Sequence, residues 1–283
     1  MLDIEKINQI ADPKVRKQLK LDILKSAKKK KQNVLKSDFL SFVKHIWPEF
    51  VEGYHHKKIS DAFNRLRTGE LRRLIINMPP RHTKSEFASY FLPAWMIGNN
   101  PNLKIIQATH TAELAVRFGR KAKTLIDSEE YQELFTTRLR EDSKAAGRWE
   151  TDKGGEYFAV GVQGAVTGRG ADLLIIDDPH SEQDVYSPSA FDKAYEWYTS
   201  GPRQRLQPGG RIVLVMTRWS TKDLTAQLVN ASAKEDKADK WEVIEFPAIM
   251  PDGNPVWPEY WKLEDLLAVK ASAGVSKWNA QYM

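Results

Sequence analysis

The sequence predicts an α/β protein in which helices cover both faces of a mostly parallel sheet. Two continuous apolar runs, residues 173–176 and 211–216, are typical of strands that are buried on both faces of a parallel sheet. Segments of strand length alternate with segments of helix length, as in repeated βαβ units. Between residues 71 and 91, a short apolar strand leads through a compact loop into a helix. We therefore expect a three-layer αβα fold.

The individual elements follow from the spacing of apolar residues along the chain. The expected strands are residues 74–77, 104–109, 148–151, 157–160, 173–176, 211–216 and 241–246. The expected helices are residues 85–97, 111–127 and 189–199, of which the second is amphipathic and the third is the crossover between the two buried strands. A charged stretch, residues 231–240, is expected to be an exposed loop, and the Pro/Trp-rich and then helical residues 248–283 a small subdomain.

The composition is that of an ordinary globular protein. The 283 residues are 41% hydrophobic and 28% charged, which suffices for one large core and a small appendage. The most apolar stretch, residues 90–97, is interrupted by Pro93 and is much shorter than the roughly 20 residues that cross a bilayer. We therefore expect no membrane partner. Because there is no cysteine, disulfides and thiolate metal sites are excluded.

The positive charge is concentrated at the N-terminus. Residues 1–36 carry 11 Lys and Arg against 4 Asp and Glu, whereas residues 37–283 are close to neutral. We interpret residues 1–36 as a basic helical extension and residues 37–247 as the core. The run from Lys28 to Lys31 has two interpretations, contact with nucleic acid or an acidic partner and a solvated helix end.

The loop before the first core helix has the features of a phosphate-binding loop. It ends in Lys84 and Ser85, where an ammonium can reach outer phosphates and a hydroxyl can ligate Mg²⁺ beside the free N–H groups of a helix N-terminus. The usual pattern G-x-x-x-x-G-K-[ST] would place glycine at positions 78 and 83, and this chain has Met78 and Thr83. The alternative is a solvated helix start that is capped by Thr83 or Ser85.

Two adjacent carboxylates, Asp177 and Asp178, follow the first buried strand. Like charges this close are hard to keep ionised without a cation, and Mg²⁺ bound to a nucleotide supplies one. We assign Asp177 to Mg²⁺ and Asp178 to the general base that activates water. The alternative is a turn and helix cap after a core strand. Because ligands bind at the carboxyl ends of parallel strands, these acids and the loop are expected to lie together.

Two further residues suit a phosphate site. Thr217 ends the second buried strand and could sense a γ-phosphate at the same edge of the sheet. Arg169 lies between Gly168 and Gly170, so its loop can turn sharply and present a guanidinium to a phosphoryl group. That group could belong to the same subunit or to an adjacent one, and we favour the adjacent one. The alternative is a surface arginine in a turn.

A possible adenine pocket precedes the first core strand by about twenty residues. In the segment from Phe50 to His56, the ring of Tyr54 could stack on a base and His55 could bond its edge. Two adjacent histidines without a third ligand nearby do not make a metal site.

Taken together, four segments closely resemble the N-terminal ATPase domain of the large terminase subunit of tailed bacteriophages, the motor that packages DNA. The segments are Pro-Pro-Arg-His-Thr-Lys-Ser at 79–85, Gly-Arg-Gly at 168–170, Leu-Leu-Ile-Ile-Asp-Asp-Pro-His at 173–180 and Met-Thr-Arg-Trp-Ser at 216–220. The resemblance covers residues from about 38 to the end. Terminases of this type tolerate a phosphate loop without glycines.

The resemblance implies an ATPase of the P-loop (ASCE, RecA-like) class that uses ATP and Mg²⁺. Lys84 and Ser85 would belong to the Walker A motif, and Asp177 and Asp178 to the Walker B motif, with Asp178 in the place of a glutamate. Arg169 matches a trans-acting arginine finger, and Thr217 matches the coupling motif. Nucleotide contacts are also expected from the other loop residues, which are Arg81, His82 and Thr83. Residues 248–283 would be the lid subdomain.

The family also implies partners and a location. Its members act as a ring, commonly of five subunits, which docks on the portal protein of a procapsid and receives double-stranded DNA from a small terminase subunit. The ring works in the host cell cytoplasm during virion assembly and does not become a structural part of the virion. We expect no nuclease activity from these 283 residues, since the family's nuclease domain would follow them. Two alternatives are a helicase-like nucleic-acid-dependent ATPase and a non-hydrolysing adaptor that binds DNA.

Overall fold

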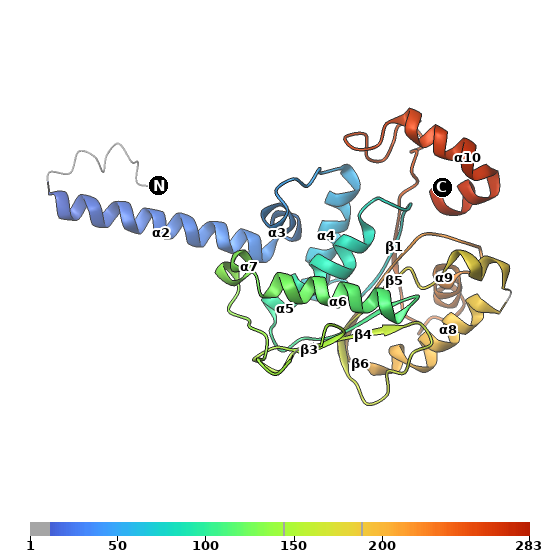
Figure 1. Cartoon of the computed structure of the whole chain (residues 1–283), viewed down its shortest axis with the longest axis horizontal. Coiled ribbons are helices and arrows are strands. Elements are labelled where there is room, and N and C mark those ends of the chain that lie inside the picture. The colour runs from blue at the N-terminus through green and yellow to red at the C-terminus, as the bar shows by residue number, and fades with distance from the viewer. Residues whose placement is uncertain (1–11, 144, 188) are drawn as a thin grey trace.

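A computed structural model describes residues 12–143, 145–187 and 189–283, and it contains one seven-stranded sheet (Figure 1). The strand order is β3-β4-β2-β5-β6-β1-β7, and every neighbouring pair is parallel except β3 and β4. The expected mostly parallel sheet is confirmed. The strands are β1 (Arg73–Asn77), β2 (Lys104–Thr109), β3 (Arg148–Glu150), β4 (Glu156–Gly161), β5 (Ala171–Asp177), β6 (Leu206–Met216) and β7 (Glu242–Glu245).

Helices cover both faces of the sheet, so the three-layer arrangement is confirmed. The helices are α2 (Pro13–Ser37), α3 (Phe39–Ile46), α4 (Tyr54–Thr68), α5 (Leu92–Asn99), α6 (Ala112–Ile126), α7 (Glu129–Leu134), α8 (Ala190–Ser200), α9 (Leu224–Lys234) and α10 (Leu263–Tyr282). Three short turns of other helix types are η1 (Glu86–Phe91), η2 (Glu182–Tyr186) and η3 (Pro202–Arg205). Successive strand residues enter opposite cores. Ile175 packs with α3 to α7, whereas Leu174 packs with α8 and α9.

Strand β6 lies between β1 and β5 and brings three chain segments together. In its pairing, Met216 is opposite Asn77 of β1, and Val215 is opposite Asp177 of β5. The ladder continues one step further on the β5 side, where the N–H of Asp178 donates to the carbonyl of Val215 at 2.9 Å. The residues that follow these three strands therefore meet at one edge of the sheet.

The helix that follows the phosphate loop differs from the α-helix that we expected over residues 85–97. Residues 86–91 form a π-helix, in which the N–H of Leu92 donates to the carbonyl of Phe87, five residues earlier. The wide turn ends just before Pro93. Since proline has no N–H, an α-helical turn at this point would leave a carbonyl unpaired, and the π turn accommodates it.

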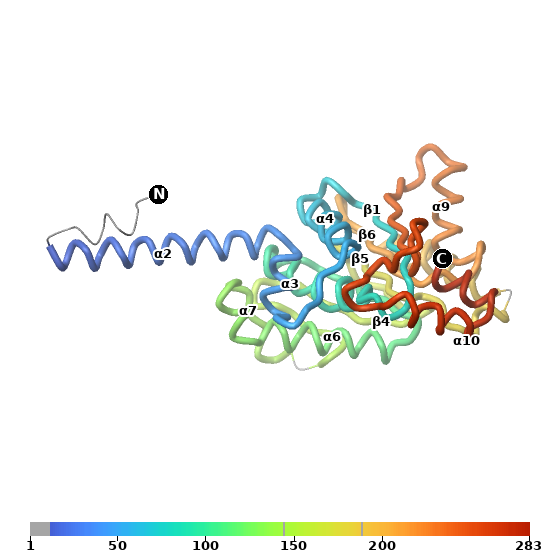
Figure 2. Tube along the Cα trace, turned by 90° about the horizontal axis from the view of Figure 1, so that it is seen from above, coloured from blue at the N-terminus to red at the C-terminus, as the bar shows by residue number. Residues whose placement is uncertain are grey.

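Helix α2 projects from the body and contacts the rest of the protein near its C-terminal end (Figures 1 and 2). The Asp12 side chain caps its first turn through the N–H of Lys14 at 2.7 Å. At the other end Leu35 is buried, and its carbonyl accepts from Trp95 Nε1 at 3.2 Å. The exposed turns between carry most of the positive charge of the N-terminal region. Within the described ranges, no helix is both long and apolar enough to cross a membrane.

Residues 248–283 leave the sheet after β7. Val256 and Trp257 of this segment pack into the main core, and other residues form a small cluster of their own. Ala248, Leu266 and Trp278 make its core, and the Trp278 ring stacks on Tyr282 with ring centres 4.6 Å apart. Helix α10 is broken at Gly274, which has a φ of 75°. We propose that this segment is the lid subdomain, with residues 37–247 as the core.

Candidate active site

The loop between β1 and η1 contains no glycine, yet two of its residues have left-handed backbone conformations. The φ angles are 63° at Arg81 and 67° at Thr83. Position 83 is where the usual phosphate-loop pattern has glycine, and a β-branched residue in this region is strained by about 1–3 kcal/mol. The carbonyl of Thr83 also accepts the N–H of Phe87 at 3.0 Å. The strained residue therefore sets the direction in which the following helix begins.

Lys84 is held inside the protein by an acidic partner. Its side chain is buried, and Nζ lies 2.8 Å from Oδ2 of Asp178. Burial alone would lower the pKa of Lys84, but the nearby carboxylates of Asp178 and Asp177 outweigh it and raise the pKa. The ammonium group therefore stays charged at the place where a phosphate would bind.

Asp177 is buried beneath the first turn after the loop. Its Oδ1 accepts from the hydroxyl of Ser85 at 2.9 Å and its Oδ2 from Ser89 at 2.7 Å, while Ser89 Oγ accepts from Gln107 Nε2 at 2.9 Å. Burial, and then the charge of Asp178, raise the pKa of Asp177 to about 7. Asp177 thus links the acidic strand directly to the predicted metal ligand Ser85.

Asp178 joins the loop to the end of β6. One of its oxygens, Oδ1, accepts the backbone N–H of Thr217 at 2.8 Å, and the other forms the ion pair with Lys84. Its backbone is in the left-handed region, with a φ of 42°. Unlike Asp177, its side chain is 28% exposed, so a water molecule can reach it. The structure therefore brings the loop, both acids and Thr217 together at one edge of the sheet.

The charges of this cluster suit a divalent cation. Two carboxylates face one ammonium, and burial together with the charge of Asp178 raises the pKa of Asp177 to about 7 although Lys84 acts in the opposite direction. No group of three or more His, Asp or Glu side chains that could hold a metal occurs among the residues that the structure describes. Mg²⁺ commonly takes one or two protein ligands and completes its shell with phosphates and water. Ser85 and Asp177 fit that role.

Arg169 lies at the amino-terminal end of β5, whereas the two acids lie at the carboxyl end of the same strand. It precedes the first residue of β5, whereas Asp178 follows the last, and the seven residues of that strand span roughly 20 Å at about 3.3 Å per residue. Its guanidinium is ion-paired with Glu156 and lies over the Phe158 ring, with Cζ 3.8 Å from the ring centre. The distance is far longer than an arginine side chain, so Arg169 does not reach the Lys84 site of its own chain.

The other predicted nucleotide-binding residues differ in whether they are exposed or buried. Arg81 is exposed on the loop, but His82 points inward, where its Nδ1 is 2.8 Å from the carbonyl of Pro80 and its ring stacks on Trp261. On the first turn of α4, Tyr54 is 54% exposed, whereas His55 has no exposed surface. A base could stack on Tyr54, but it could bond His55 only after that ring had been uncovered.

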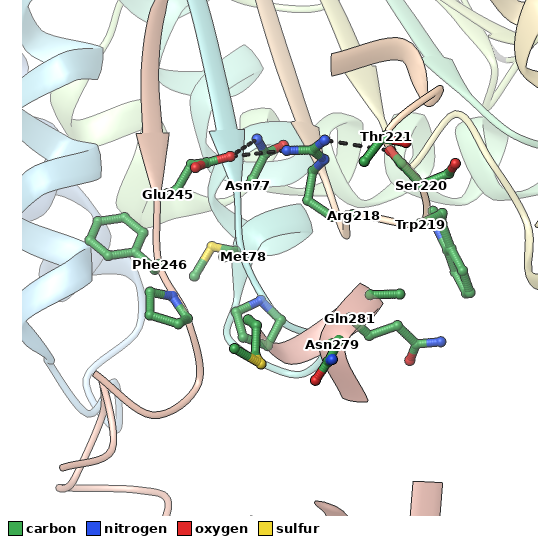
Figure 3. A pocket seen from close by; sticks show the side chains of 14 residues that line it. Asn77, Met78, Arg218, Trp219, Ser220, Thr221, Glu245, Phe246, Asn279 and Gln281 are labelled. Carbon is green, nitrogen blue, oxygen red and sulfur yellow. Dashed lines mark hydrogen bonds and ion pairs between the residues drawn. The ribbon is translucent and has the colours of Figure 1, made fainter. Parts of the chain in front are cut away.

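A cavity of about 550 Å³ opens beside the start of the loop (Figure 3). Its walls come from the ends of three neighbouring strands and from the end of α10. The lining residues are Asn77, Met78, Pro79, Arg218, Trp219, Ser220, Thr221, Glu245, Phe246, Pro247, Asn279, Ala280, Gln281 and Met283. In Figure 3 the guanidinium of Arg218 extends along the cavity wall toward Glu245, and the two are 3.1 Å apart.

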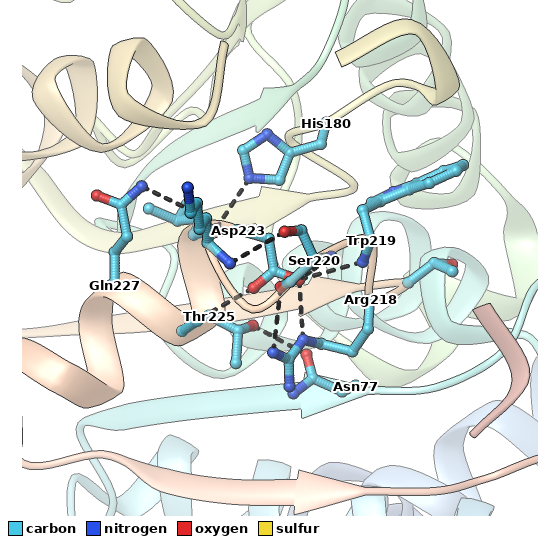
Figure 4. A network of polar contacts seen from close by, with 12 residues as sticks. Asn77, His180, Arg218, Trp219, Ser220, Asp223, Thr225 and Gln227 are labelled. Atoms are coloured by element: carbon cyan, nitrogen blue, oxygen red, sulfur yellow. Dashed lines mark hydrogen bonds and ion pairs between the residues drawn. The ribbon is translucent and has the colours of Figure 1, made fainter. Parts of the chain in front are cut away.

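A polar network fixes the turn that carries Thr217 into α9 (Figure 4). Its centre is Asp223, which is fully buried and accepts from Arg218 Nε at 2.9 Å and from the N–H of Trp219 at 3.1 Å. From the β5 side, His180 Nε2 accepts the N–H of Leu224 at 3.0 Å. The segment after Thr217 is therefore tied both to α9 and to the strand that carries the acids.

Comparison with known proteins identifies solved structures of similar fold. No family model matches the chain, and no curated protein matches it either. A solved large terminase of bacteriophage HK97 matches 82% of this chain at a TM-score of 0.55, with 11% identity and 50% of its own length covered. The chain has the fold of a phage large terminase.

The large terminase of a thermophilic bacteriophage is also similar to this chain. One crystal form has a TM-score of 0.49 and 11% identity, with 75% of this chain and 51% of that chain covered. The form in complex with ADP has a TM-score of 0.42 and 12% identity, with 75% and 47% covered. The chain thus spans about half the length of the solved terminases that it matches.

Several residues of this site were not singled out from the sequence. Ser89 lies four residues after Ser85, so helical spacing would have placed it on the same face. Gln107 is a polar residue within the otherwise apolar strand β2. Asp223 could have been recognised as the N-cap of α9.

The buried histidines around this site predict a loss of stability in acid. Burial is the main cause that lowers the pKa of His55 to about 3, of His56 to about 2, and of His82 and His180 to about 4, from 6.5. Below pH 6.5 the unfolded chain binds protons that the folded protein does not, so stability falls by up to about 1.4 kcal/mol per pH unit for each histidine. The thermal unfolding midpoint should be level above pH 7 and fall between pH 6.5 and 4. An unfolding midpoint that stayed constant down to pH 5 would contradict this prediction.

Proposed function

We propose that this chain is the ATP-hydrolysing motor domain of a viral DNA-packaging terminase, which translocates double-stranded DNA into a procapsid. The observation that carries this proposal is the cluster of Lys84, Ser85, Asp177, Asp178 and Thr217 at the carboxyl edge of the sheet. These side chains come from three strand ends that are far apart in the sequence. The terminase fold supports the same function.

The geometry supports a distinct role for each group. Lys84 and the N–H groups at the start of the helix bind the phosphates, after which Lys84 no longer needs Asp178 as its counter-ion. When Mg²⁺ is bound with ATP, it neutralises charge that develops on the phosphates. Ser85 and Asp177 would hold this ion. Both oxygens of Asp177 are already bonded to serine hydroxyls.

Asp178 is better placed than Asp177 to act as the general base. It is partly exposed, and release from Lys84 frees its Oδ2 to accept a proton from water. Its other oxygen stays bonded to the backbone of Thr217, so a movement of Asp178 is passed directly to the end of β6. Thr217 couples the chemistry to that strand and, through the Asp223 network, to α9.

Arg169 acts in this proposal on the active site of a neighbouring subunit. Its position at the opposite end of β5 supports this role, and a ring built from head-to-tail interfaces brings different surfaces of neighbouring subunits together. We propose a ring, commonly of five subunits in this family, docked on the portal protein of the procapsid in the host cell cytoplasm. A small terminase subunit delivers the DNA.

The proposal is tested with portal-bearing procapsids and linear double-stranded DNA, to which either wild-type protein or a mixture of the Arg169→Ala and Lys84→Ala variants is added. Wild type alone should convert the DNA to a nuclease-resistant form in an ATP-dependent reaction. Each variant alone should be inactive, but where the intact finger of a Lys84→Ala subunit meets the intact site of an Arg169→Ala subunit, a finger that acts in trans should restore ATP turnover in the mixture. Removal of an arginine finger costs roughly 10³–10⁵ in turnover, while the nucleotide affinity of Arg169→Ala should be retained.

Arg148→Ala is the matched control, since Arg148 also pairs with Glu156, at 3.4 Å, but lies outside the Gly-Arg-Gly segment. Alone and in mixtures with wild type, it should hydrolyse ATP and package DNA at the wild-type rate. Absence of restored turnover in mixtures of Arg169→Ala and Lys84→Ala would exclude a finger that acts between subunits. Absence of ATP-dependent protection with wild type would exclude the packaging function.

A further inference from the structure

His56 is hydrogen-bonded to the strained residue of the phosphate loop. Its Nε2 lies 2.6 Å from Oγ1 of Thr83, and Thr83 Oγ1 in turn is 2.6 Å from the carbonyl oxygen of His82. On the other side of the ring, the backbone N–H of Gly53 donates to His56 Nδ1 at 2.8 Å. A continuous chain of hydrogen bonds thus runs from the start of α4 into the loop.

The direction of every proton in this chain follows from its first donor. A backbone N–H can only donate, so Nδ1 of His56 is the acceptor and the proton of a neutral ring is on Nε2. Nε2–H therefore donates to Thr83 Oγ1, and the Thr83 hydroxyl donates its own proton to the carbonyl of His82. Burial lowers the pKa of His56 to about 2, which keeps the ring neutral as this arrangement requires.

Aromatic rings hold His56 in this orientation. The ring centres of Phe50, Phe87 and Trp257 lie 4.6, 5.0 and 4.9 Å from it. Gly53 allows this packing, since a Cβ at that position would lie 2.6 Å from the Trp257 ring. The imidazole is therefore a rigid support for the hydroxyl of Thr83.

We propose that His56 is a positioning residue for the phosphate loop. Its hydrogen bond to Thr83 stabilises the left-handed backbone conformation that a glycine at this position would adopt without support. Thr83 adopts a left-handed backbone that glycine enters without strain. The next two residues are Lys84 and Ser85, so the conformation of Thr83 determines where the ammonium and hydroxyl groups point. The inference rests on the proposed binding of nucleotide at this loop.

The other buried histidines of this cluster lack such complete pairing. The neighbouring His55 is equally buried, and neither of its ring nitrogens makes a hydrogen bond of normal geometry with any described residue. In His82 only Nδ1 is bonded within the described part of the chain. Both nitrogens of His56 are paired, and one of those pairs is made with the residue in the glycine position.

The test is a double-mutant cycle between His56→Phe and Thr83→Gly, with Mg·ATPγS affinity measured by calorimetry. Phenylalanine keeps an aromatic ring in the same space but cannot donate to Thr83. We expect His56→Phe to weaken binding by about tenfold or more in the Thr83 protein. In the Thr83→Gly background the same change should alter the affinity by less than about twofold, because glycine needs no support.

Phe63→Leu serves as a control for general destabilisation, since Phe63 is buried on the same helix and packs on Phe39. It should lower the unfolding temperature without changing the affinity for Mg·ATPγS. An equal loss of affinity from His56→Phe in both backgrounds would overturn the proposal and leave His56 as a packing residue.

A second readout separates failure of this inference from failure of the proposed function. Without nucleotide, Thr83→Gly should raise the unfolding temperature more in the His56→Phe protein than in the wild type. If wild type did not bind Mg·ATPγS but the coupling in unfolding temperature were present, the support of Thr83 would stand and the ATPase proposal would fail. Absence of that coupling would overturn the role of His56.

Discussion

Lys84→Ala is expected to abolish measurable ATP turnover. Removing one oriented electrostatic group from an active site costs about 10²–10³ in turnover, and Lys84 is expected to contribute to phosphate binding as well. The substitution also leaves Asp177 and Asp178 without the cation that offsets part of their charge. Steady-state ATP hydrolysis and Mg·ATPγS calorimetry should show both turnover and affinity reduced.

Lys104→Ala is the control for the Lys84 experiment, since Lys104 is an exposed lysine at the start of β2, at the other edge of the sheet. It should hydrolyse ATP at the wild-type rate. Full turnover by Lys84→Ala would show that the loop at 78–85 does not bind the phosphates.

Asp178→Asn is expected to separate binding from hydrolysis. The amide oxygen still accepts the N–H of Thr217, so the β6 end is retained, but the general base is lost, at a cost of roughly 10²–10⁴ in turnover. Binding should improve, because Lys84 no longer has to leave an ion pair at 2.8 Å in order to meet a phosphate. Single-turnover hydrolysis and calorimetry measure the two effects.

The Asp178 result also discriminates between the two acids. If Asp178→Asn hydrolysed ATP at the wild-type rate, the base would have to be sought elsewhere. If Asp178→Asn weakened the binding of Mg·ATPγS instead of improving it, Asp178 would not compete with the nucleotide for Lys84.

Much of the sheet could be predicted from the sequence, because buried strands are continuous apolar runs. β2 was expected at 104–109 and is found there, and the strand expected at 173–176 is the centre of β5. The phosphate loop, Asp177 with Asp178, and Thr217 lie together because they follow neighbouring parallel strands, and ligand-binding residues gather at the carboxyl ends of such strands. Local pattern and topology point to the same site.

What could not be predicted depends on contacts between distant segments. The π turn before Pro93 depends on how one carbonyl is satisfied, and the burial of His55 depends on Trp257, about two hundred residues later in the chain. The pairing of Arg169 with Glu156 is equally invisible in a linear sequence. Strain at Thr83 was foreseeable from the missing glycine, but its support by His56 was not.

The projecting helix α2 makes this protein an electric dipole. It carries ten Lys and Arg residues and one Asp over roughly 37 Å of helix, while the sequence from residue 37 onward is nearly neutral. In the field of a polyanion such as double-stranded DNA, the molecule experiences a torque that turns this positive end forward before any contact forms. The alignment weakens at physiological salt, where the screening length is about 8 Å. Ionic strength would thus set how strongly the protein is aligned when it first meets a polyanion.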